Sequence, residues 1–91
     1  VICGYVRSPF CFANKGELIK MRPDDLVAFV IKALIEKTKV NPADLEDVIL
    51  GCSFPEGEQG MNMGRLVALL ADLPQSVAGT TVNRFCGSSM T

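Results

Sequence analysis

The stretch "DVILGCSF", residues 47–54, has the pattern of a strand in a parallel sheet. Its apolar run, Val48 to Leu50, is continuous rather than alternating. Continuous apolar runs are typical of parallel strands that are covered on both faces. The next six residues, "PEGEQG", contain proline and glycine and predict a loop. This stretch therefore indicates a parallel sheet, with the loop at the carboxyl end of one of its strands.

Strand-like and helix-like segments alternate on both sides of this stretch. Short apolar runs rich in β-formers predict strands, and apolar residues at helical spacing predict amphipathic helices. The predicted segments are a strand at 1–7, a helix at 24–38, the strand at 47–54, a helix at 61–73 and a strand at 76–85. The order β-α-β-α-β predicts an α/β fold with a mostly parallel sheet covered by helices.

Two local signals refine this outline. Asn41 before Pro42 has the pattern of an N-cap followed by a first-turn proline, which predicts a helical turn. Gly64 lies inside the second predicted helix, where glycine costs about 1 kcal/mol relative to alanine. We therefore expect close packing on the Gly64 side of that helix.

Composition and charge argue against two classes of function. The chain has 91 residues, of which 48% are hydrophobic and 21% charged, as in ordinary globular proteins. Nine basic residues face ten acidic ones, and no basic run predicts a nucleic-acid partner. No apolar stretch approaches the roughly 20 residues of a membrane-spanning helix, and no signal-peptide pattern is visible. We expect one domain of a cytoplasmic protein, without a membrane span.

The four cysteines do not form a metal motif. No two of them form a C-x-x-C pair, and the chain has no histidine, which argues against a zinc site. A disulfide framework is not expected in a cored protein without a secretory signal. We therefore expect a reducing compartment, with Cys3, Cys11 and Cys52 packed as small hydrophobic residues.

The fourth cysteine, Cys86, follows the last predicted strand in "VNRFCGSSMT", residues 82–91. Sites in parallel α/β sheets form beyond the carboxyl ends of strands. The small residues after Cys86 allow a tight turn into a helix, whose free N–H groups would favour the thiolate. Cys86 is then a candidate nucleophile for acyl transfer, and its own N–H could help to hold an oxyanion. The alternative is a buried structural cysteine at a strand end, and any histidine base has to come from elsewhere.

Other polar residues near this edge have weaker alternatives. Glu56 and Glu58 could do acid–base work, but a solvated loop or a subunit contact is the simpler interpretation. Arg84 would share a strand face with Cys86 if the strand continued, and could bind substrate or pair with an acidic loop residue. Asn83 is expected to hold the turn by hydrogen bonds.

The motif "VNRFCGSSM" resembles the nucleophile motif of the thiolases. "RSPF", residues 7–10, resembles the opening strand-to-loop segment of the family, and residues 42–90 follow its amino-terminal half almost end to end. "PEGEQG" together with "NRFCGSSM" is most similar to degradative 3-ketoacyl-CoA thiolases, with biosynthetic acetoacetyl-CoA thiolases second. Departures from the family pattern concern the subfamily, and they are Ser8, Cys11, Phe12, Gly64 and Ala78.

This resemblance implies an activity and its substrates, and it implies that residues 1–91 hold only part of the catalytic machinery. Cys86 would take the acyl group of a 3-ketoacyl-CoA as a thioester, and coenzyme A would receive it as a substrate rather than a bound cofactor. The family works as homodimers or homotetramers. Its activating histidine and second cysteine lie in the carboxyl-terminal half, so residues 1–91 are expected to be an amino-terminal fragment of the first domain, inactive alone. The alternatives are an acetoacetyl-CoA thiolase running in the condensing direction and an inactive assembly module.

Overall fold

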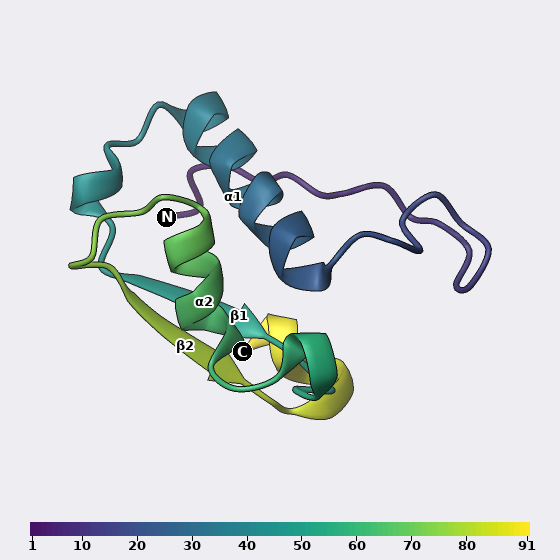
Figure 1. The fold of residues 1–91 in the computed structure, drawn as a ribbon. Coiled ribbons are helices and arrows are strands. Elements are labelled where there is room, and N and C mark those ends of the chain that lie inside the picture. The colour runs from purple at the N-terminus through teal and green to yellow at the C-terminus, as the bar shows by residue number, and fades with distance from the viewer.

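The computed structural model describes residues 1–91 and has the α/β character that the sequence predicts (Figure 1). The helices and strands are α1 (Pro23–Thr38), β1 (Asp47–Gly51), α2 (Met63–Leu70) and β2 (Ala78–Val82). Three short 3₁₀ helices join or follow them: η1 (Pro42–Asp44), η2 (Gly57–Gln59) and η3 (Phe85–Met90). None of the helices has the length and apolar character that crossing a membrane requires.

The sheet consists of β1 and β2, paired in parallel as predicted. Asp47 lies opposite Ala78, and Gly51 lies opposite Val82. The ladder continues one step further, because the Cys52 N–H donates to the Val82 carbonyl at 3.0 Å. Since α2 carries the chain back between the two strands, both carboxyl ends lie at the same edge of the sheet.

The core lies on one face of this sheet. α2 packs on β2 and α1 packs on α2, so the two helices cover the same side (Figure 1). On the other face Ile49 is 66% exposed, because residues 1–91 place no helix there. The expected cover on both faces is therefore present on one face only. The core residues are Ala28, Ala68, Ala71, Leu73 and Val77, with Ile31, Ile35, Leu45 and Val48 packed around them.

α1 begins and ends where the sequence signals predict. Pro23 opens the helix, and the Arg22 guanidinium lies 3.0 Å from the buried Asp24 carboxylate in the first turn. This hydrogen bond holds the pKa of Asp24 below its ordinary value. Lys39 ends the helix in the left-handed region, with its N–H donating to the Ile35 carbonyl. The turn predicted at Asn41 is also confirmed, because the Asn41 side chain accepts the Ala43 N–H at 3.2 Å.

α2 lies so close to β2 that two glycines form the contact. A Cβ atom added at Gly64 would overlap the backbone of Thr80, and one added at Gly79 would overlap the backbone of Arg65. The close packing expected at Gly64 is thus confirmed. Asn62 caps the helix and joins it to the strand, because its amide donates to the Gly79 carbonyl at 2.8 Å and its carbonyl accepts from Thr81 Oγ1 at 2.9 Å.

The strand predicted at residues 1–7 is not formed. Residues 1–22, here called the arm, contain neither helix nor strand and extend beside and beyond α1 (Figure 1). A strand needs the N–H and C=O groups of a neighbour, and the arm pairs with neither β1 nor β2. Its Tyr5 carbonyl instead accepts a hydrogen bond from Lys37 Nζ at 3.1 Å.

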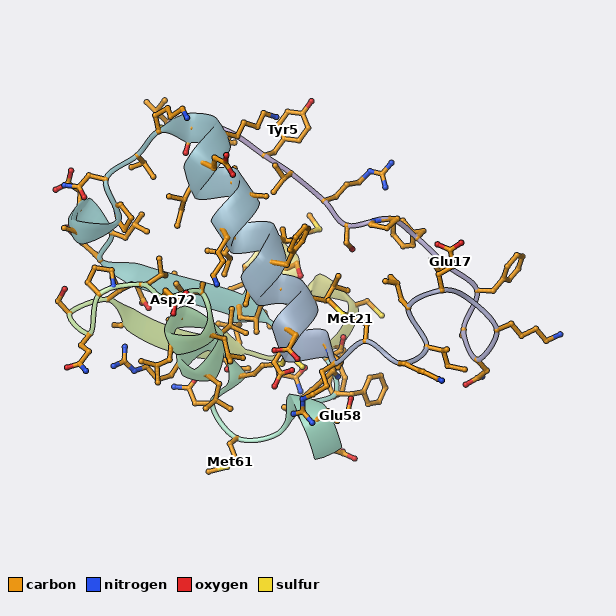
Figure 2. The ribbon with its side chains drawn as sticks, turned by 45° about the horizontal axis from the view of Figure 1, so that its top comes forward. Tyr5, Glu17, Met21, Glu58, Met61 and Asp72 are labelled. Carbon is orange, nitrogen blue, oxygen red and sulfur yellow. The ribbon has the colours of Figure 1, made fainter.

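The prediction that three cysteines are packed holds for the sheet but not for the arm. Cys52 is buried at the end of β1, as expected for a packed thiol. The prediction was wrong for Cys3 and Cys11, which are exposed because the arm has nothing packed over it. The methionines also differ, since Met63 is buried in α2 while Met61 points away from the fold (Figure 2).

Candidate active site at the end of strand β2

The candidate nucleophile lies where β2 leaves the sheet. The strand ends at Val82, and the chain turns at once into η3, in which Cys86 is the second residue. The helical turn therefore begins one residue before Cys86 rather than just after it, and it is a 3₁₀ helix of 6 residues. In Figure 1 it is the yellow coil at the carboxyl end of the two strands.

The residue before Cys86 has a strained backbone. Phe85 has a φ of 50°, in the left-handed region that bulky residues rarely occupy. Both of its backbone groups are bound by side chains: the Phe85 N–H donates to Asn83 Oδ1 at 2.9 Å, and the Phe85 carbonyl accepts from Ser88 Oγ at 2.7 Å. The role predicted for Asn83 is thereby confirmed. The Asn83 amide also donates at 3.4 Å to the carbonyl of Ser53, which lies two residues past the end of β1.

Ser88 is buried beneath the turn, and its side chain bonds to the backbone of the turn. It is 6% exposed, and it is one of only two buried polar residues in the chain. Its hydroxyl donates to Phe85 as described and accepts the Arg84 N–H at 3.0 Å. The hydroxyl thus joins the backbone before Cys86 to the backbone after it.

The end of β1 packs closely against this turn. A Cβ atom added at Gly51 would come within 2.5 Å of the Ser89 nitrogen and 2.6 Å of the Ser88 carbonyl carbon. Real Cβ atoms do not approach backbone so closely, so only glycine at residue 51 lets η3 lie here. The turn is therefore seated on the first strand as well as attached to the second.

The Cys86 thiol is free and exposed. Within residues 1–91 Cys86 is therefore not packed in the core, unlike Cys52. A thiol in this position can act as a nucleophile in acyl transfer when a base is beside it. No group of side chains in the chain has the arrangement of a metal site.

The other candidate residues do not join Cys86. Glu58 lies near the start of α1 (Figure 2), where its carboxylate is 3.8 Å from Arg22, and Glu56 is exposed. These two residues are therefore solvated and make one ion pair, as the simpler interpretation predicted, although Glu58 lies in the 3₁₀ helix η2 rather than in a loop. Arg84 forms no ion pair, and it shares no strand face with Cys86 because β2 has already ended.

Two residues of this site, Ser88 and Gly51, are not predicted by the sequence patterns above. The available signal for Ser88 was its spacing, since a serine hydroxyl can bond to backbone groups three or four residues earlier. Gly51 gave no such signal, because its neighbour across the gap is 37 or 38 residues later in the chain.

Comparison with known proteins identifies the family of the chain. The family described as "Thiolase, N-terminal domain" matches residues 1–91. A 3-ketoacyl-CoA thiolase of Acinetobacter baylyi is 47% identical over 90 residues, and one of Bacillus subtilis is 42% identical over 90 residues. Each match covers 99% of this chain and 23% of the relative, so the chain spans about a quarter of the length of the relatives it matches. The chain belongs to the thiolase family.

Proposed function

We propose that residues 1–91 supply the acyl-accepting cysteine of a 3-ketoacyl-CoA thiolase. The observation that carries this proposal is the exposed Cys86 thiol, held at the carboxyl end of a parallel strand in a chain of the thiolase family. The relatives quoted above are named 3-ketoacyl-CoA thiolases, which supports that substrate class.

The proposed reaction has two steps at Cys86. The thiolate attacks the 3-keto carbon of the substrate, the bond between carbons 2 and 3 breaks, and the acyl group remains on sulfur as a thioester. The electron pair left on carbon 2 takes up a proton, which releases acetyl-CoA. The thiolate of a second coenzyme A then attacks the thioester and leaves with an acyl chain that is two carbons shorter, while Cys86 is regenerated.

The proposal assigns the remaining groups to sequence outside residues 1–91. The chain has no histidine, so the base for Cys86 and the group that moves the substrate proton would come from the rest of the protein. Residues 1–91 would then be the amino-terminal part of the first thiolase domain, and a homodimer or homotetramer would be the working form. The four free cysteines suit a reducing compartment such as the cytoplasm.

The test replaces Cys86 in the complete protein. Cys86→Ser should lower the rate of 3-ketoacyl-CoA cleavage by at least about a thousandfold, as expected for loss of a covalent nucleophile. Cys11→Ser is the matched control, because Cys11 is also an exposed free thiol but lies in the arm. Incubation with substrate in the absence of free coenzyme A should leave the acyl mass on the peptide that contains Cys86.

Two results would contradict the proposal. One is a Cys86→Ser protein that still cleaves the substrate at the normal rate, and the other is acyl label on a different residue. Cleavage confined to acetoacetyl-CoA, with longer 3-ketoacyl-CoA substrates left intact, would instead favour the biosynthetic type of thiolase.

A further inference from the structure

We propose that Ser88 and Gly51 are positioning residues for the Cys86 nucleophile. The inference rests on the proposed function and deepens it, because neither residue is assigned a chemical step. Both act on the backbone that carries Cys86, one from inside the turn and one from the neighbouring strand.

Ser88 acts by holding the strained residue beside the nucleophile. A left-handed conformation is unfavourable at a non-glycine residue, so it persists only where the surroundings fix it. The Ser88 hydroxyl bonds to the Phe85 carbonyl at 2.7 Å, and the same oxygen accepts the Arg84 N–H at 3.0 Å. Cys86 follows Phe85 directly, so relaxation of Phe85 would rotate the peptide plane that joins the two residues and redirect the Cys86 side chain.

Gly51 acts by leaving room for the turn. The backbone of Ser88 and Ser89 occupies the space where a side chain at residue 51 would begin. Any larger residue at that position has to push η3 away from the strand edge. Because the obstacle is backbone rather than the tip of a flexible side chain, the displacement would reach Cys86.

Ser88 differs from the next residue, Ser89, in how far it is buried. Ser88 is 6% exposed, while Ser89 is exposed to solvent. The two serines are adjacent and chemically identical, but only the Ser88 hydroxyl bonds to the turn. Ser89→Ala is therefore a matched control for Ser88→Ala.

The experiment measures turnover per working active site in the complete protein. The fraction of protein whose Cys86 accepts an acyl group in the first turnover is determined by mass spectrometry, and kcat is divided by that fraction. Ser88→Ala should lower this per-site kcat by about 10- to 100-fold, the loss expected when a reacting group is misplaced, with KM changed less than about twofold. Ser88→Thr, which keeps the hydroxyl, should restore most of the rate, and Ser89→Ala should be normal.

A purely structural role would give a different result. Ser88→Ala would then reduce the fraction of protein that takes the label while per-site kcat stayed normal, and that outcome would overturn the inference. If Ser88→Ala does not fold, Gly51→Ala decides by the same measurement, and a normal per-site kcat again overturns it. A wild-type protein that transfers no acyl group would instead count against the proposed function itself.

Discussion

The arm and the β1–α2–β2 unit are both rich in apolar residues, yet they are buried to very different extents. In the arm, Ile2 and Phe10 are 90% and 94% exposed. In the unit, Val67 and Val77 are 0% exposed. Apolar character alone therefore does not decide which segment is ordered into a core. The unit has its strand partner and its covering helix within 36 residues, whereas the arm has no strand partner and no helix over it.

The largest expected effect that tests this difference comes from an added methyl group. Gly79→Ala puts a Cβ atom against the backbone of Arg65 and Gly64, where nothing can yield. We expect the free energy of unfolding to fall by about 3 kcal/mol, as for overpacking of a tight core. Gly4→Ala in the arm meets mainly the Thr38 side chain and should cost less than about 1 kcal/mol.

Urea unfolding of the complete protein measures both values. Equal losses for the two variants would remove the contrast, since they would mean that the arm is packed as rigidly as the unit once the rest of the protein is present.

The next effect comes from removing methyl groups rather than adding one. Val67→Ala deletes two fully buried methyl groups from α2, and we expect a loss of about 2 kcal/mol from the transfer and cavity costs. Ile2→Ala deletes more carbon atoms from an exposed position and should change the free energy of unfolding by less than about 0.5 kcal/mol. Thermal and urea unfolding of the complete protein can compare the two variants. A loss of stability for Ile2→Ala as large as that for Val67→Ala would show that other parts of the protein cover the arm.

The smallest expected effect lies at the boundary where the arm meets α1. The Arg22 hydrogen bond lowers the pKa of Asp24 from its ordinary value of 3.8. A lowered pKa in the folded state means that the stabilisation is present above the ordinary value and is lost as the pH falls through the lowered one. Asp24→Asn should therefore cost less than about 1 kcal/mol near neutral pH, as for a partly exposed ion pair, and this cost should disappear in acid.

The control is Asp25→Asn, which removes an exposed carboxylate in the same turn of α1. Denaturant midpoints measured over a series of pH values would show the difference. A cost of Asp24→Asn that stays constant into acid would mean that packing, rather than the charge on Asp24, holds the start of the helix.

The sequence predicted the elements whose hydrogen bonds are local or whose partners are close. α1 was predicted to within one residue, because its apolar spacing and its acidic first turn are properties of the segment itself. β1 and β2 were predicted because a single crossover helix joins them. The arm was predicted as a strand and is not one, because strand formation depends on a neighbour that the local pattern cannot reveal.

The candidate site follows the same division. The place of Cys86 at the end of β2 was predictable from the segment order. The role of Asn83 was predictable because its side chain bonds to a backbone group only two residues away. The contact of η3 with Gly51 was not predictable, because it results from packing between segments far apart in the sequence. The left-handed Phe85 was not predictable either, because a bulky residue rarely adopts that conformation. Ser88 lies between these cases, since its spacing is local but its burial depends on the fold.

The close seat of η3 on Gly51 has a consequence for synthesis on the ribosome. Every residue that shapes the Cys86 turn lies between β1 and the end of η3, so the turn can be assembled as soon as that stretch has emerged. Chains generally fold from the amino terminus while synthesis continues. The turn that carries Cys86 can then take its folded shape from contacts within the stretch from β1 to η3 alone.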